Sequence, residues 1–94
     1  MIDADKQIIL NKKNQLLVAV GNIVHKMRLQ ANKGINRFSF EYDIGNGLLS
    51  RLERGTTDTQ ISTLWKIANA LEIKTSDLIK MIENELPDDF NFYD

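Results

Sequence analysis

The segment Leu49-Ser50-Arg51-Leu52-Glu53-Arg54-Gly55 decides the fold, because it has the pattern of a short helix with a defined end. Its two leucines, with Leu48 before them, recur at helical spacing and share one face, while the serine and the arginines project elsewhere. An arginine in the last turn followed by a glycine is a common helix ending. We therefore predict a helix that begins near Asn46, buries its leucines and ends at Arg54.

A second helix is predicted over residues 60–71, after a polar loop. Either Asp58 or Thr59 in that loop can cap its first turn through a side-chain oxygen. The apolar residues of this helix recur at helical spacing and are expected to form one buried stripe, which places Trp65 in the core: Ile61, Leu64, Trp65, Ala68 and Leu71.

A third helix is predicted from Thr75, which is a good capping residue, to about Glu85. Pro87 prevents its continuation, because proline has no amide hydrogen to donate. The apolar residues expected to face inward are Leu78, Ile79 and Ile82.

Two more helices are predicted on the N-terminal side. A spacing of i, i+3, i+4, i+7 indicates a helix over about residues 16–31, with its buried face at Val20, Ile23, Val24 and Met27. Residues 1–15 are expected to form an arm or a separate short helix, because the polar run 11–14 interrupts the apolar pattern. A short helix over 35–42 is followed by a turn at 43–47, in which Gly45 is a cap or turn residue and Gly47 a first-turn residue.

Length and composition indicate one small all-α domain. The chain has 94 residues with a single proline, and its short apolar-periodic segments are best buried by packing helices on helices. We divide it into an N-terminal segment (1–15), a domain (16–86) and a tail (87–94). Without cysteine there is no disulfide or thiolate metal site. With no long apolar run and no signal-peptide pattern, a cytoplasmic protein without membrane contact is expected.

The net charge of −1 conceals an asymmetric distribution. Residues 1–80 carry all twelve lysines and arginines against eight acidic residues, whereas residues 81–94 carry five acidic residues and no basic one. A basic body with an acidic appendage is typical of nucleic-acid-binding domains, although a solvated surface with a random charge split is the alternative.

With these residues placed, the stretch from about Leu17 to Ile82 resembles the repressor/Cro-type (XRE-like) helix-turn-helix family. The strongest part runs from Leu49 to Leu78, where the buried positions, the Glu53-Arg54-Gly55 ending and the segment 65–71 match without gaps. The resemblance implies a five-helix, lambda-repressor-like domain, whose second and third helices form the DNA-reading motif.

The resemblance also assigns candidate DNA contacts. In family members the first turns of the third helix enter the major groove, which makes the residues at these positions base-facing: Asn46, Gly47, Ser50 and Arg51. Arg51 can bind guanine, and Asn46 can bind adenine, through two parallel hydrogen bonds. Residues bordering the same face are expected to contact phosphates: Arg37, Arg54, Thr56, Thr57 and Gln60.

Two further features follow from the same comparison of positions. The family pairs an arginine late in the first helix with the glutamate that ends the third, and these positions hold Arg28 and Glu53, to which we assign a structural ion pair. Where the family has a polar cap and a glutamine at the start of the second helix, this chain has Gly34 and Ile35. The turn glycine of the family falls at Asp43, a residue type that tolerates left-handed backbone angles.

No constellation in the sequence indicates an enzyme, a metal site or a cofactor. His25 is the single histidine and has no clustered partner, and Asp88 with Asp89 lies in a tail rather than a pocket. The tail combines acidic residues with Phe90, Phe92 and Tyr93, so it is either disordered or docked on the domain or on a second protomer.

The sequence therefore predicts a sequence-specific transcriptional regulator, a repressor that binds double-stranded DNA as a homodimer. One alternative is an antitoxin-type member of the same family, which binds a toxin and its own operator, with the N-terminal arm or the tail as the partner-binding part. Another is a protein-interaction module that kept the fold and no longer binds DNA.

Overall fold

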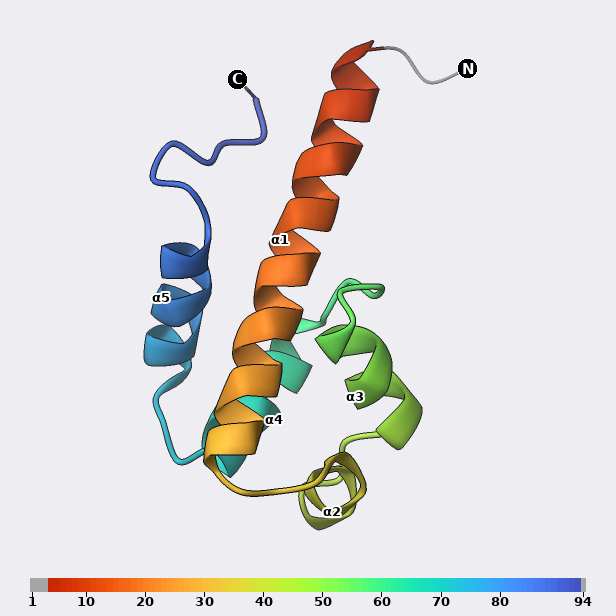
Figure 1. The fold of residues 1–94 in the computed structure, drawn as a ribbon, viewed down its shortest axis with the longest axis vertical. Coiled ribbons are helices and arrows are strands. Elements are labelled where there is room, and N and C mark those ends of the chain that lie inside the picture. Colours follow the sequence, from red (N-terminus) through yellow and green to blue (C-terminus); the bar gives the residue numbers. More distant parts are fainter. Residues whose placement is uncertain (1–3, 94) are drawn as a thin grey trace.

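The computed structural model describes residues 4–93 and folds them into five helices, with no strand in that range (Figure 1). In chain order the helices are α1 (Ala4–Gln30), α2 (Ile35–Glu41), α3 (Asn46–Glu53), α4 (Ile61–Ala70) and α5 (Thr75–Glu85). The long α1 runs the length of the molecule, with α2 and α3 on one side and α5 on the other (Figure 1). The predicted all-α, five-helix fold is confirmed.

α1 is longer than the sequence suggested, because it continues without a break through residues 11–14. The expectation of a separate arm or short helix is wrong for residues 4–15, and residues 1–3 lie outside the described part of the chain. The polar run 11–14 interrupts the apolar pattern, but it contains neither glycine nor proline, and lysine is a good helix former. A helix can therefore continue where its buried stripe stops.

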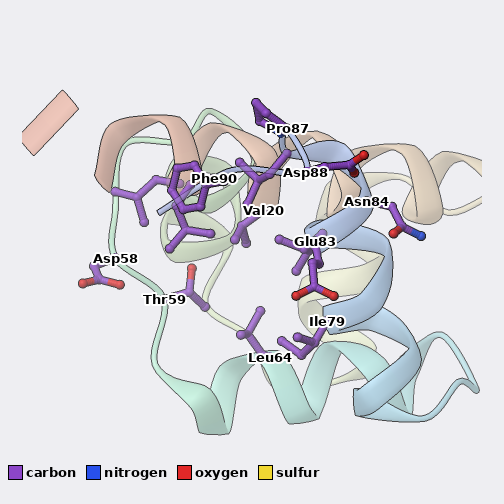
Figure 2. Close-up of a pocket in the computed structure, with 14 residues that line it drawn as sticks. Val20, Asp58, Thr59, Leu64, Ile79, Glu83, Asn84, Pro87, Asp88 and Phe90 are labelled. Atoms are coloured by element: carbon purple, nitrogen blue, oxygen red, sulfur yellow. The ribbon is translucent and has the colours of Figure 1, made fainter. Parts of the chain in front are cut away.

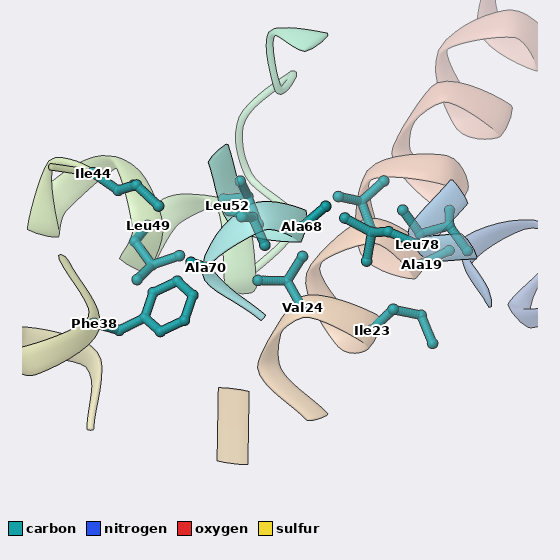
Figure 3. Packing of buried hydrophobic residues seen from close by; sticks show 13 residues of the cluster. Ala19, Ile23, Val24, Phe38, Ile44, Leu49, Leu52, Ala68, Ala70 and Leu78 are labelled. Atoms are coloured by element: carbon teal, nitrogen blue, oxygen red, sulfur yellow. The ribbon is translucent and has the colours of Figure 1, made fainter. Parts of the chain in front are cut away.

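The core lies between the five helices, and each helix contributes apolar side chains to it (Figure 3). Val24 of α1, Phe38 of α2, Leu49 of α3, Ile67 of α4 and Leu78 of α5 are all fully buried. Burial of such a side chain stabilises the fold by about 1.5–3 kcal/mol. Leu49 and Leu52 of the predicted leucine face therefore hold α3 against the domain, whereas Leu48 is only partly buried and lies outside the core.

Two glycines allow the C-terminal end of α3 to lie directly on α1. A Cβ atom at Gly21 would lie 2.6 Å from the carbonyl oxygens of both Leu52 and Glu53, a separation that no side chain tolerates. Gly55 follows the end of α3 with φ +72°, in the left-handed region that favours glycine, and a Cβ there would lie 2.9 Å from the Cα atom of Val18. The position of α3 is thus set by backbone contact as well as by side chains.

The turn between α2 and α3 has the backbone that the sequence suggested. Asp43 adopts φ +52°, so it takes the left-handed conformation for which the family uses glycine. Gly45 is the N-cap residue of α3, Ile44 beside it is buried, and Arg54 is the C-cap. Both ends of α3 therefore lie within one residue of their predicted positions.

The buried face of α4 differs from the predicted one. Ile61 and Trp65 were expected in the core, but they are 70% and 54% exposed. The face that packs inward carries Ile67 and Ala68, with Leu64 partly buried beside them. Two overlapping stripes satisfy the same i, i+3, i+4, i+7 rule in this helix, and the stripe that starts at Leu64 is the buried one.

The predicted side-chain caps of α4 and α5 are also wrong. Gln60 and Lys74 are the N-cap residues, and neither makes a side-chain cap hydrogen bond. α4 begins later than the Asp58 or Thr59 cap requires, whereas Thr75 is already the first helical residue of α5. Ile79, expected to face inward, is 43% exposed at the edge of α5.

The tail lies beside α1 and has no helix over residues 86–93 (Figure 1). Lys12 donates a hydrogen bond to the backbone carbonyl of Asn91, and the rings of Phe90 and Phe92 meet edge to face with centroids 5.5 Å apart. Phe90 therefore belongs to the packed part of the chain. Among the described residues, no helix is both long and apolar enough to cross a membrane.

Candidate nucleic-acid interface

The outward face of α3 carries the residues predicted to read bases. Asn46, Gly47 and Arg51 are exposed and Ser50 is partly exposed, while Leu49 and Leu52 are buried in the core. α3 lies on the side of α1 opposite to α5 (Figure 1), and the exposure of Asn46, Gly47 and Arg51 shows that no helix of the described residues covers them. A rigid helix with polar groups on its free side is the element that fits the major groove of a duplex.

Asn46, the first residue of α3, is held by a residue that the sequence analysis missed. Its side-chain amide donates a hydrogen bond to the side-chain oxygen of Asn36 on α2. The second amide hydrogen and the side-chain oxygen of Asn46 are left for a ligand, and these are the two groups that an asparagine presents to adenine. Only the folded turn places Asn36 and Asn46 together, because they lie ten positions apart.

Gly47 gives Arg51 room to lie along the first turn of α3. A Cβ atom at Gly47 would lie only 3.2 Å from Nη1 of Arg51, which is tighter than most such contacts. The guanidinium group therefore rests over the glycine, near the end of the helix where Asn46 lies. Gly47 supplies no base contact of its own, but its lack of a side chain leaves room for the guanidinium group at this position.

The candidate phosphate contacts occupy the edges of α3. Arg54, Thr56, Thr57 and Gln60 lie at the end of α3 and in the loop that leads to α4. The hydroxyl of Thr56 donates to the carbonyl of Arg51 at 3.1 Å, which ties this loop to the reading helix. Arg37 on α2 is exposed but forms a 2.7 Å ion pair with Glu41. A phosphate would therefore compete with the Glu41 carboxylate for the guanidinium group.

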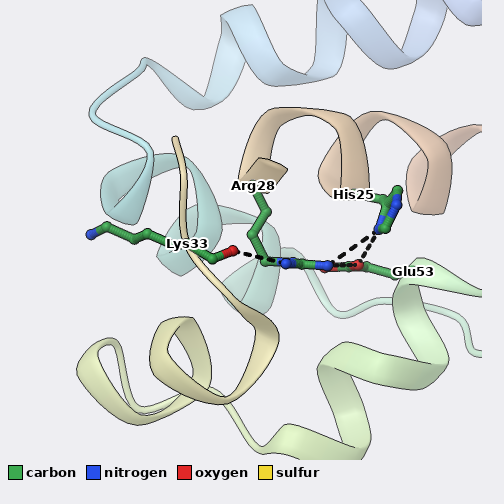
Figure 4. A network of polar contacts seen from close by, with 4 residues as sticks. All are labelled: His25, Arg28, Lys33 and Glu53. Carbon is green, nitrogen blue, oxygen red and sulfur yellow. Dashed lines mark hydrogen bonds and ion pairs between the residues drawn. The ribbon is translucent and has the colours of Figure 1, made fainter. Parts of the chain in front are cut away.

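A buried ion pair connects α1 with α3, at the positions assigned from the family resemblance (Figure 4). Arg28 donates from Nε and Nη2 to the two carboxylate oxygens of Glu53, at 2.7 and 2.8 Å. It donates from Nη1 to the carbonyl of Lys33 at 2.8 Å, so it also holds the segment that enters α2. The two side chains are only 7% and 6% exposed, and the pair therefore fixes the orientation of both helices of the motif.

His25 completes this cluster, although its sequence context gave no sign of a partner. Its Nδ1 lies 2.7 Å from Oε1 of Glu53 (Figure 4). Burial by itself would raise the pKa of Glu53, but the hydrogen bonds from Arg28 and His25 outweigh it, and the pKa lies below its ordinary value. Glu53 is therefore held as a carboxylate at the end of the reading helix.

Fold and site together define a helix-turn-helix DNA-binding regulator. The family model described as Helix-turn-helix matches residues 24–78, which include α2, α3 and α4, and the chain belongs to this family. The resemblance to repressor/Cro-type proteins is thereby confirmed, and the family consists of regulatory DNA-binding proteins rather than enzymes.

A curated relative points to the same class of protein. The chain is 30% identical over 67 residues to the control protein C.BamHI of Bacillus amyloliquefaciens, an alignment that covers 70% of this chain and 83% of that protein. No solved structure matches the chain significantly. The family and this relative support a DNA-binding transcriptional regulator.

Proposed function

We propose that this chain is a sequence-specific repressor that binds an inverted-repeat operator as a homodimer, with one copy of α3 in each of two major-groove half-sites. The observation that carries the proposal is the free face of α3, where Asn46 is oriented by Asn36 and Arg51 rests over Gly47. Two such faces, about 34 Å apart on one side of the duplex, double the number of base contacts.

Base reading is assigned to Asn46, Ser50 and Arg51, and phosphate binding to the residues that border them. A bidentate contact from Arg51 to guanine contributes about 1–3 kcal/mol of discrimination between base pairs. The bordering arginine, threonine and glutamine side chains set the register of the protein on the backbone but read no sequence. Repression would follow from occupancy of a promoter in the cytoplasm, without any cofactor.

Selection from random DNA tests this proposal. Duplexes retained by the purified protein are sequenced, and the affinity of the enriched duplex is measured for wild type, Arg51→Ala and Lys80→Ala. Lys80 is the control, because it is an exposed cation on α5. We expect an inverted repeat, a loss of preference at one base pair per half-site in Arg51→Ala, and a small uniform effect in Lys80→Ala. No enrichment, or equal effects of the two substitutions, would contradict base reading by α3.

A protein-interaction module is the second candidate, and the exposed face of α4 favours it. Ile61 and Trp65 leave a large apolar surface without a partner in one chain. Binding to mixed-sequence DNA at low salt separates the two functions. A shift that weakens steeply with added salt supports DNA binding through counterion release, whereas no shift at micromolar protein supports the interaction module.

A further inference from the structure

The N-terminal half of α1 projects beyond the other four helices, and the tail lies beside it (Figure 1). The buried residues that α1 contributes begin at Leu17, whereas Ile8, Ile9 and Leu10 are 41%, 38% and 40% exposed. Three consecutive exposed apolar side chains on this part of α1 form a surface that is suited to packing against a second protein.

The projecting half continues the buried stripe of α1. Leu10, Lys13, Leu17, Val20 and Val24 follow alternating spacings of three and four, which is the pattern of a helix that packs against another helix. The last three of these residues are buried in the domain, but the stripe runs on past the edge of the core. We call residues 6–15 of α1 the ledge.

An open apolar groove lies at the base of the ledge, between α1, α5 and the start of α4 (Figure 2). Its volume is about 610 Å³. Apolar side chains from α1, α4, α5 and the tail line it: Leu16, Leu17, Val20, Leu64, Ile79, Ile82, Leu86 and Phe90. In Figure 2, Leu64 and Ile79 face each other across its floor, and Phe90 lies by Val20 on the α1 side.

The charges of the ledge and of the groove have opposite signs. Residues 6–15 contain three lysines and no acidic residue. The charged residues that line the groove are Asp58, Glu83 and Asp88, and neither lysine nor arginine is among its lining residues. Within one chain Lys13 pairs with Asp58 at 3.5 Å, and this pair is exposed, so a second copy would exchange it for an equivalent pair between the chains.

We propose that the ledge of one copy of this chain docks on the groove of a second copy, so that the two α1 helices pair antiparallel. The arrangement is self-complementary, since each chain offers one basic apolar helix and one acidic apolar groove. A two-fold axis makes both contacts at once and closes the assembly as a dimer. This inference rests on the proposed homodimer and assigns its interface.

Matched isoleucine substitutions test the interface in the full-length protein. Sedimentation equilibrium without DNA measures dimer dissociation for wild type, Ile9→Ser and Ile61→Ser, with thermal melts to confirm folding. Ile61 is the control, because it is the more exposed isoleucine, on the rival apolar face of α4. We expect dissociation to become at least about tenfold easier in Ile9→Ser and to change little in Ile61→Ser. A wild type that is monomeric at tens of micromolar, or the reverse order of effects, would overturn the proposal.

Photocrosslinking locates the contact directly. Ile9→p-benzoylphenylalanine is mixed with isotope-labelled wild type, and crosslinked peptides are identified by mass spectrometry. We expect intermolecular products with the groove residues of α5 and the tail, whereas products with α4 near Trp65 would place the interface elsewhere. A monomer that still binds its selected operator would refute this interface and leave the DNA-binding proposal intact. A dimer that binds no DNA would support this interface and refute the DNA-binding proposal.

Discussion

At the scale of single residues, the link between α1 and α3 depends on Glu53. Its carboxylate accepts two hydrogen bonds from Arg28 and lies 2.7 Å from His25, while the side chain is almost fully buried. Removing one partner of a buried pair leaves an uncompensated charge, and that loss is larger than the net contribution of the intact pair. Glu53 is therefore a structural residue located next to a binding face.

We predict that Glu53→Ala lowers the free energy of unfolding by about 3–5 kcal/mol. The variant would lose DNA binding because it loses the fold. Urea or thermal unfolding measures the effect, with Glu41→Ala as control, since Glu41 forms an exposed ion pair with Arg37 and contributes little. An unchanged melting temperature in Glu53→Ala would refute the structural role of the pair.

The same residue makes stability depend on pH. Because the pKa of Glu53 is lower in the folded chain than its ordinary value of 4.5, its contribution is complete above that value and is lost as pH falls through the folded pKa. Urea unfolding from neutral pH down to about pH 3 should show this loss. In Glu53→Gln the decline should be shallower, and identical pH profiles of the two proteins would contradict the assignment.

Gly47 has a different role, because its missing side chain leaves space for Arg51. Gly47→Ala should leave stability unchanged or raise it by up to about 1 kcal/mol, since alanine is the better helix former. The new methyl group should displace the guanidinium and weaken preference at the base pair that Arg51 reads. Melting and operator binding, measured together, check both parts. Unchanged base preference would show that the observed position of Arg51 is not the one used on DNA.

At the scale of elements, the seating of α3 on α1 depends on Gly21. We predict that Gly21→Ala destabilises the protein by about 1–3 kcal/mol or more, because a Cβ atom meets two carbonyl oxygens of α3 and forces the helices apart. Helix propensity alone predicts that Gly21→Ala would stabilise the protein, because alanine is the better helix former. Gly34→Ala is the control, as a Cβ atom there meets nothing within 4 Å. Unfolding experiments that rank the two variants equally would contradict the close contact.

The elements show how far a sequence can predict this fold. The bounds of α3 could be predicted, because the leucine spacing and the Arg54-Gly55 ending agree with each other. The buried face of α4 could not, because stripes starting at Ile61 and at Leu64 satisfy the same periodicity and only tertiary packing selects one. The continuity of α1 was missed because an interrupted apolar stripe was interpreted as an interrupted helix.

The candidate site was predictable only in part. Asn46, Gly47, Ser50 and Arg51 could be named from the sequence because the family resemblance assigns these positions, and the structure places them on the exposed side of α3. The amide contact from Asn36, the hydrogen bond from His25 and the space above Gly47 arise between residues that folding brings together. Local patterns describe which face a residue occupies, but not which partner orients it.

At the scale of the whole molecule, function depends on how the charges are distributed. The excess of basic residues lies in residues 1–80, whereas Glu83 on α5 and Asp88 in the tail border the groove. α3 itself lies on the opposite side of α1 from α5 and the tail (Figure 1). The acidic end is therefore kept apart from the face that would approach phosphates.

The most direct test of the account is a backbone amide NMR titration of the wild-type protein with the duplex recovered by selection. The account predicts that the largest shift changes fall on Asn46, Gly47, Ser50 and Arg51, with smaller ones on the loop from Thr56 to Gln60. Changes concentrated on the groove or on the outer face of α4, with α3 unaffected, would contradict it.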